Sequence, residues 1–166
     1  IRVQFDKLVE QGKMYYSSAG PSSGAQGCFM VNNKPPFDNL KLRQAVNLTL
    51  DRTAIGEVQF GNKYVEQLLF YNQGLEYATP KEQIWNIVPG WGTGAKKQQE
   101  IEQAKQLVKD AGYPSGIDVV QLNRINNEAD VYNDEAQREL TKVGIRAKFE
   151  LLDIVTHLQR LADSNY

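Results

Sequence analysis

Residues 34–52, with the sequence KPPFDNLKLRQAVNLTLDR, hold the densest set of local signals in this chain of 166 residues. The two prolines restrict their own backbone and keep each preceding residue out of helical geometry. Asp38 then offers a side-chain acceptor to the free amides of a first helical turn. The residues that recur at helical spacing and form one buried face are Leu42, Ala45, Val46, Thr49 and Leu50. Asp51 predicts a second N-cap, so two helices should meet at a corner and the second should end before Gly61.

The second half of the chain alternates between helical and strand patterns. The helical runs cover residues 100–111, 129–143 and 154–162, and the strand runs cover residues 117–122 and 145–151. Val119 and Val120 are typical of a strand buried on both faces, whereas the second strand alternates apolar and charged residues. Asp153 predicts the N-cap of the last helix. This order indicates a mixed α/β fold with a partly parallel sheet flanked by helices.

The first half is less regular outside the corner. Its short strand patterns cover residues 1–5, 14–16 and 27–33, with a helical piece at 6–11 and a Ser/Gly-rich loop at 17–27. Cys28 lies in an apolar strand pattern, which favours a buried thiol. Residues 62–99 show no sustained period, and we expect an irregular segment with one helical turn near Lys81.

The bulk composition excludes several classes of function. With 19 basic and 20 acidic residues the net charge is −1, so the chain lacks the basic excess that nucleic-acid binding requires. Its apolar runs are too short to cross a bilayer, so we expect no membrane insertion of this segment. One cysteine excludes an internal disulfide.

An enzyme is poorly supported, and we expect no catalytic residues, no metal site and no cofactor. His157 is the only histidine, and a lone histidine on a helix is more often a surface or packing residue than a base. The run Gly90-Trp91-Gly92 lacks the strand–helix context of a phosphate-binding loop. Glu100 and Glu102 are predicted to be a solvated helix N-terminus.

Three blocks of sequence resemble a known family. Residues 29–52, FMVNNKPPFDNLKLRQAVNLTLDR, are similar to the signature region of the family 5 extracellular solute-binding proteins, the peptide-, dipeptide- and nickel-binding receptors of ABC importers. Residues 103–116, QAKQLVKDAGYPSG, and residues 140–145, LTKVGI, resemble two later segments of that family. One departure is that residues 98–100, QQE, stand where the family usually opens a helix with Asp-Pro.

The resemblance implies a periplasmic-binding-protein-like lobe of class II. We expect residues 1–166 to be a single α/β lobe, the C-terminal lobe of a two-lobe receptor, isolated from its N-terminal partner and holding half of a ligand cleft. It further implies an extracytoplasmic protein, periplasmic or lipid-anchored, that binds a peptide or another small solute and delivers it to ABC permease subunits.

The resemblance also points to ligand-binding residues. Arg124 follows a strand at the edge where open α/β sheets bind ligands, and in dipeptide-binding relatives an arginine near this place contacts the ligand carboxylate. An exposed loop arginine is an equal alternative. Asn123 and Asn126 are predicted either to bind peptide groups or to shape the turn. Trp91 and Tyr64 are candidates for an aromatic cleft wall, although core packing is the favoured interpretation for both residues. Arg43 is expected to pair with a nearby carboxylate or carbonyl and hold the corner.

Two questions stay open from the sequence. The family binds peptides, nickel complexes, some sugars and other solutes, and the sequence does not discriminate among them, although an oligopeptide or dipeptide is favoured. The alternative function is the solute-sensing domain of a transcriptional regulator, which some relatives provide.

Overall fold

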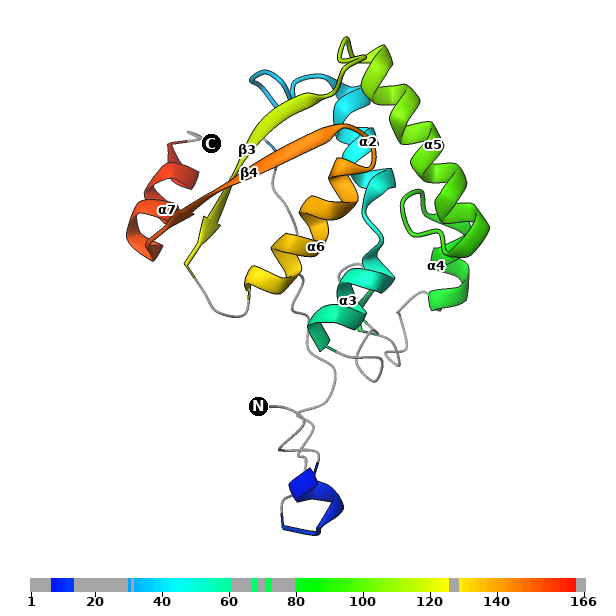
Figure 1. Ribbon diagram of the computed structural model, residues 1–166, viewed down its shortest axis with the longest axis vertical. Coiled ribbons are helices and arrows are strands. Elements are labelled where there is room, and N and C mark those ends of the chain that lie inside the picture. Colours follow the sequence, from blue (N-terminus) through cyan, green and yellow to red (C-terminus); the bar gives the residue numbers. More distant parts are fainter. Residues whose placement is uncertain are drawn as a thin grey trace.

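Figure 1 shows the computed structural model, which describes residues 7–13, 30, 32–60, 67–68, 71–72, 80–125 and 129–163. The predictions for the strands at 1–5 and 14–16, the loop at 17–27, Cys28, Tyr64 and Asn126 lie outside these residues. The predicted early helical piece is present as one turn at residues 7–10, after which the amide of Gly12 donates to the carbonyl of Val9.

The described elements confirm the mixed α/β class. The helices are α2 (Leu40–Thr49), α3 (Arg52–Phe60), α4 (Lys81–Ile87), α5 (Gly94–Asp110), α6 (Ala129–Thr141) and α7 (Ile154–Ala162). The strands are β1 (Gln67–Leu68), β2 (Tyr71–Asn72), β3 (Ile117–Arg124) and β4 (Ile145–Leu152). β1 and β2 form a short antiparallel pair, and β3 and β4 form a parallel pair.

The helix corner forms as predicted, with one change at its start. The prediction that Asp38 caps α2 is wrong, because Asn39 holds that place and its side chain accepts from the amide of Lys41 at 3.0 Å. Asp38 instead belongs to the preceding turn. The second cap is confirmed, since Oδ1 of Asp51 accepts from the amide of Ala54 at 3.0 Å.

Arg43 also takes its predicted structural role. Its guanidinium donates to the carbonyl oxygens of Phe37 at 2.6 Å and Asp38 at 3.0 Å. These bonds tie α2 to the turn that precedes it, so Arg43 holds the start of the corner.

The core lies where α2 packs against α5 and where α6 packs against β4. Its buried apolar residues are Leu42, Ala45, Val46, Leu48, Leu50, Ile55, Ile101, Ala104, Val108, Ala136, Leu140, Val143, Ile145 and Ala147. The predicted face of α2 is therefore the buried one. Thr49 joins it because its hydroxyl donates to the carbonyl of Ala45 at 2.7 Å, which satisfies the polar atom.

The sheet confirms the predicted strands but corrects the burial of β3. The register runs in parallel from Ile117 opposite Ile145 to Arg124 opposite Leu152. The prediction that β3 is buried on both faces is wrong, because Val120 is 56% exposed. Only one face of the strand pair packs on α6 in the described residues, and side chains alternate between the two faces.

The segment predicted to be irregular contains two helices. α4 is longer than one turn, and α5 begins at Gly94 rather than at Glu100. Thr93 precedes α5 with an extended backbone but makes no side-chain capping bond, so the start of this helix lacks the usual sequence signal. The prediction that Glu100 is a solvated helix start is wrong, because its side chain is only 7% exposed and accepts from the amides of Gly90 and Gly92.

Candidate functional site

The carboxyl ends of β3 and β4 form the candidate ligand-binding edge. Both strands run in the same direction, so both end at one edge of the sheet, beside α7 and away from α2 and α5 (Figure 1). In open α/β sheets, ligands bind at this edge. Asn123 and Arg124 are the last two residues of β3, so Arg124 lies on the strand rather than in the loop where it was predicted.

Arg124 presents an exposed guanidinium at this edge. Among the described residues it has no hydrogen-bond or ion-pair partner for its side chain. Arg146, at the other end of the sheet, is different: its Nε lies 2.6 Å from Oδ1 of Asp118. That hydrogen bond lowers the pKa of the Asp118 carboxyl. The edge at the carboxyl end thus carries a cation available for an external anion.

Asn123 points into the protein instead. Its Oδ1 accepts from Nε2 of Gln121 at 3.1 Å, and the same Nε2 lies 3.3 Å from Oδ1 of Asn133 on α6. Asn123 and Asn133 are both buried, and Nδ2 of Asn123 has no partner in the described part of the chain. Alternation along the strand therefore places Asn123 and Arg124 on opposite faces of β3.

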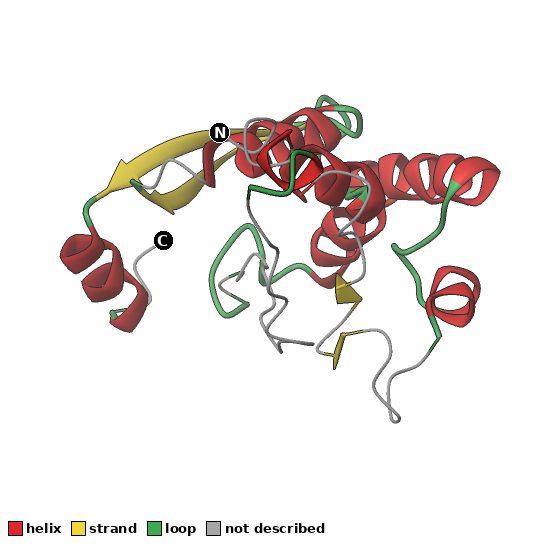
Figure 2. Cartoon of the chain, turned by 90° about the horizontal axis from the view of Figure 1, so that it is seen from below, coloured by secondary structure: helices red, strands yellow, loops and turns green. Residues whose placement is uncertain are grey.

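Trp91 lies across the molecule from this edge. It follows α4 and precedes α5, which Figures 1 and 2 show on the far side from α7. The guanidinium of Arg52 lies over its ring, 4.9 Å from the centroid, a cation–π contact. The structure therefore does not bring Trp91 together with Arg124, and it gives the ring a partner at the helix corner.

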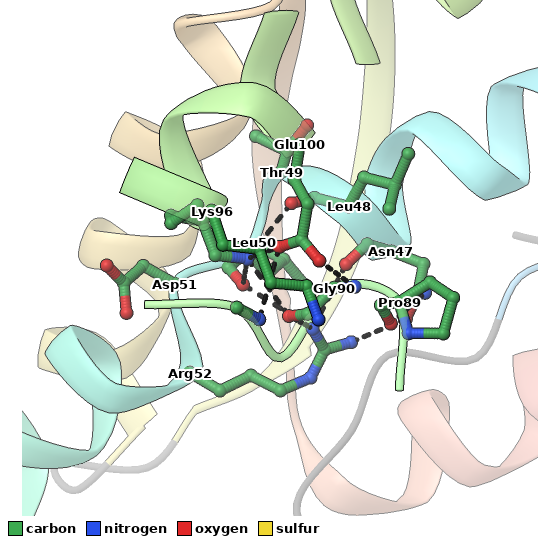
Figure 3. Close-up of polar contacts among 12 residues, drawn as sticks. Asn47, Leu48, Thr49, Leu50, Asp51, Arg52, Pro89, Gly90, Lys96 and Glu100 are labelled. Atoms are coloured by element: carbon green, nitrogen blue, oxygen red, sulfur yellow. Dashed lines mark hydrogen bonds and ion pairs between the residues drawn. The ribbon is translucent and has the colours of Figure 1, made fainter. Parts of the chain in front are cut away.

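A buried polar junction, which the sequence reasoning missed, joins the corner to α5 (Figure 3). Nζ of Lys97 lies 2.9 Å from Oε2 of Glu100, and their side chains are only 6% and 7% exposed. Lys97 donates to the carbonyl oxygens of Leu48 at 3.1 Å, Leu50 at 3.2 Å and Gly90 at 3.0 Å. The ammonium therefore caps the carboxyl end of α2, where free carbonyls and the helix dipole favour a cation.

Glu100 completes the junction from the other side. Its carboxylate accepts from the amides of Gly90 at 2.8 Å and Gly92 at 3.2 Å. Arg52 closes the same loop by donating to the carbonyl of Gly90 at 2.6 Å and to Oδ1 of Asn47 at 2.7 Å. Every charge here has a partner within the protein, so the junction is structural. The Lys and the Glu three residues apart are visible in the sequence, but the same spacing occurs in the exposed pair Glu102 and Lys105, so the pattern alone does not indicate a buried junction.

The described residues also bear on metal binding and membrane insertion. They contain no group of three or more His, Cys, Asp or Glu side chains that could hold a metal ion. His157 lies partly buried on α7, where Nδ1 has no partner among the described residues. No helix within the described ranges is long and apolar enough to span a membrane.

Sequence comparison decides the family. The profile of the family described as "Bacterial extracellular solute-binding proteins, family 5 Middle" matches residues 2–166. The chain belongs to this family. Among curated relatives, the glutathione-binding protein GsiB of Escherichia coli K12 is 28% identical over 151 residues. That match covers 88% of this chain but 26% of the relative, so the chain spans about a quarter of the relative's length.

Solved structures confirm the fold. Haemophilus influenzae OppA in complex with the peptide RPPGFSPFR matches 99% of this chain and 32% of its own, with a TM-score of 0.66 and 20% identity. The agropinic acid complex of AgaA from A. tumefaciens R10 gives a TM-score of 0.57 at 28% identity, covering 81% of this chain and 26% of that one. The family 5 resemblance and the binding-protein-like α/β fold expected from the sequence are thereby confirmed.

Proposed function

We propose that this chain is part of a receptor that binds a peptide or a similar small solute outside the cytoplasm and delivers it to an ABC permease. Family membership supports the general role of solute binding. The relatives narrow the ligand class, because their names and complexes include glutathione, a nonapeptide and agropinic acid. A free carboxylate is the group that these ligands share.

The exposed guanidinium of Arg124 is the observation that carries this proposal. It lies at the carboxyl end of a parallel strand, and in the described residues nothing neutralises it. A guanidinium donates two parallel hydrogen bonds to a carboxylate, which gives both affinity and orientation. We therefore assign Arg124 to the carboxylate of the solute. Asn123 stays a candidate through its unpartnered Nδ2, although its side chain is buried on the face of β3 toward α6, opposite to Arg124.

Transport needs no covalent chemistry in this chain. A ligand that contacts two lobes binds the closed form better than the open one, and it shifts the population toward closure by that difference in affinity. Asn126, Tyr64 and Trp91 remain candidates for contacts on this lobe. Trp91 lies across the molecule from the carboxyl ends of β3 and β4, so it would contact only a solute large enough to reach the helix corner. Arg52 already covers one face of its ring.

The test uses the full-length gene product that contains these 166 residues. Di- to nonapeptides and glutathione are screened by thermal shift, and each ligand that binds is titrated by calorimetry. Arg124→Ala should weaken binding about 10- to 150-fold, the loss expected for one charge-assisted hydrogen-bonding partner. Arg124→Lys should recover only part of it, because an ammonium cannot form the two parallel bonds.

Arg146→Ala is the matched control, since it removes the same charge from the opposite end of the same sheet. It should leave the affinity unchanged. Equal affinities of wild type and Arg124→Ala would rule out the role of Arg124. Failure of the wild-type protein to bind any of these solutes would overturn the peptide-receptor proposal itself.

A further inference from the structure

The face of β3 that lies toward α6 changes from apolar to polar along the strand. Ile117 and Val119 pack against the core. Gln121 and Asn123 follow on the same face, because side chains alternate along a strand. Asn123 is buried, and so is Asn133 of α6. Burying a side-chain amide costs free energy unless it is hydrogen-bonded, so apolar residues would cover this end of the strand at lower cost.

The side chains of Gln121, Asn123 and Asn133 form one set of hydrogen bonds, the amide network. Nε2 of Gln121 donates to Oδ1 of Asn123 at 3.1 Å and to Oδ1 of Asn133 at 3.3 Å. In the described residues α6 packs mainly against β4, where Gln137 donates to the carbonyl of Ala147. α6 starts near the carboxyl end of β3 (Figure 1), and the amide network gives that end its own hydrogen-bonded link to the helix.

Backbone pairing and the amide network hold β3 in different directions. The hydrogen bonds to β4 lie in the plane of the sheet and fix the register as far as Arg124, which lies opposite Leu152. Movement out of that plane is limited by the groups on the two faces. Apolar contacts are not directional, whereas hydrogen bonds fix a distance and an angle. The amide network therefore sets the distance between the end of β3 and α6.

Arg124 follows the amide network directly in the sequence and projects from the other face of β3. Asn123 and Arg124 share one planar peptide group, so a displacement of Asn123 relative to α6 also displaces the Cα of Arg124. Two parallel hydrogen bonds from a guanidinium to a carboxylate need accurate placement of both groups. Binding side chains keep such placement when the residues behind them are held by packing and hydrogen bonds.

We propose that Gln121 and Asn133 are positioning residues for the solute. Through the amide network they hold the end of β3 at the distance from α6 that lets Arg124 meet the carboxylate of the solute. This inference rests on the proposed function, because it needs Arg124 to bind that carboxylate. Neither Gln121 nor Asn133 touches the solute, so loss of the network should weaken binding only through Arg124.

Near-isosteric apolar variants of the full-length gene product test the proposal. Gln121→Met removes the donor and Asn133→Leu removes one acceptor, and both keep most of the side-chain volume. The probe is the tightest-binding solute among glutathione and the di- to nonapeptides of the screen, titrated by calorimetry. Each variant should weaken binding about 3- to 30-fold, within the range of coupling between residues of one hydrogen-bond network. Thermal unfolding establishes that each variant is folded.

Gln137→Met is the matched control. It removes the same kind of hydrogen bond from the same helix, but near the start of β4 and away from the ends of the strands. It should lower Tm and leave the affinity for the solute unchanged. An equal loss of affinity in Gln137→Met and Gln121→Met would show a general effect of destabilisation and would overturn the proposal.

A double-mutant cycle with Arg124→Ala separates positioning from direct contact. In the Arg124→Ala background, Gln121→Met and Asn133→Leu should cause no further loss of affinity. A further loss as large as in the wild-type background would show that the network acts without Arg124, and the inference would be wrong. If Arg124→Ala weakens binding but the two network variants bind like wild type, this inference fails and the proposed function stands. If Arg124→Ala itself binds like wild type, both fail.

Discussion

Replacing Glu100 by alanine removes the central acceptor of the buried junction. The variant leaves the ammonium of Lys97 without its counter-ion and the amides of Gly90 and Gly92 without their acceptor. Breaking a buried ion pair by removing one partner costs about 3–5 kcal/mol. For a domain of this size, that corresponds to a fall in Tm of about 6–20 °C. Thermal unfolding followed by circular dichroism measures it directly.

The same helix contains a matched control. Glu102 also pairs with a lysine three residues away, Lys105 at 2.7 Å, but these side chains are 58% and 40% exposed. That hydrogen bond lowers the pKa of Glu102, yet water can replace the lysine, so Glu102→Ala should leave Tm unchanged. Glu100→Gln keeps an acceptor for the glycine amides while removing the charge, and its Tm should fall between the two.

These three variants separate burial from charge. If Glu100→Ala and Glu102→Ala lowered Tm equally, the assignment of Glu100 as the acceptor that holds the corner to α5 would be refuted. If Glu100→Gln matched wild type, the hydrogen bonds to the glycine amides would carry the stabilisation and the ion pair with Lys97 would not.

Three further predictions follow from local geometry. Asn39→Ala should destabilise the protein by about 1 kcal/mol in urea unfolding and Asp38→Ala by clearly less, since Asn39 caps α2; equal effects would contradict this. Gly90→Ala should lower Tm far more than Gly112→Ala. Both glycines have positive φ, but of the two only Gly90 would place a Cβ against a backbone carbonyl of α2. A larger fall in Tm for Gly112→Ala would refute this reasoning. A hydrogen bond from the first turn of α7 lowers the pKa of Asp153 below its ordinary 3.8, so the cap stabilises α7 fully above that pH. This stabilisation is lost as the pH falls through the lowered pKa of Asp153, so amide exchange in α7 should become faster there. Asp153→Asn should abolish that pH dependence.

The sequence predicted local structure correctly where a single interaction between neighbouring residues determines it. Helical spacing located the buried face of α2, and the caps at Asp51 and Asp153 follow from their own side chains. Asp38 and Asn39 are both good capping residues, so the choice between them depends on the preceding turn. Local pattern alone does not resolve that choice.

The errors arise where distant segments meet. Glu100 was predicted to be part of a solvated helix N-terminus, but it lies inside α5, where the amides of Gly90 and Gly92 donate to its carboxylate and Lys97 pairs with it. Val120 was predicted to be buried together with its neighbour Val119, but its side chain points to the other face of β3 and is 56% exposed. Arg124 was proposed from the resemblance and from its place after a strand pattern, and its role in binding stays a prediction. The sequence pattern ended this strand at Leu122, whereas pairing with β4 continues it to Arg124 and so places Asn123 and Arg124 on opposite faces.

The most direct test of the central claim is to identify the solute that the full-length gene product carries. The protein is purified without denaturation, and native mass spectrometry followed by release of the ligand gives the mass and fragments of the bound molecule. We predict one non-covalently bound molecule per chain, a peptide or related solute with a free carboxylate, and its loss in Arg124→Ala but not in Arg146→Ala. A bound solute without an anionic group, retained equally by both variants, would contradict the account.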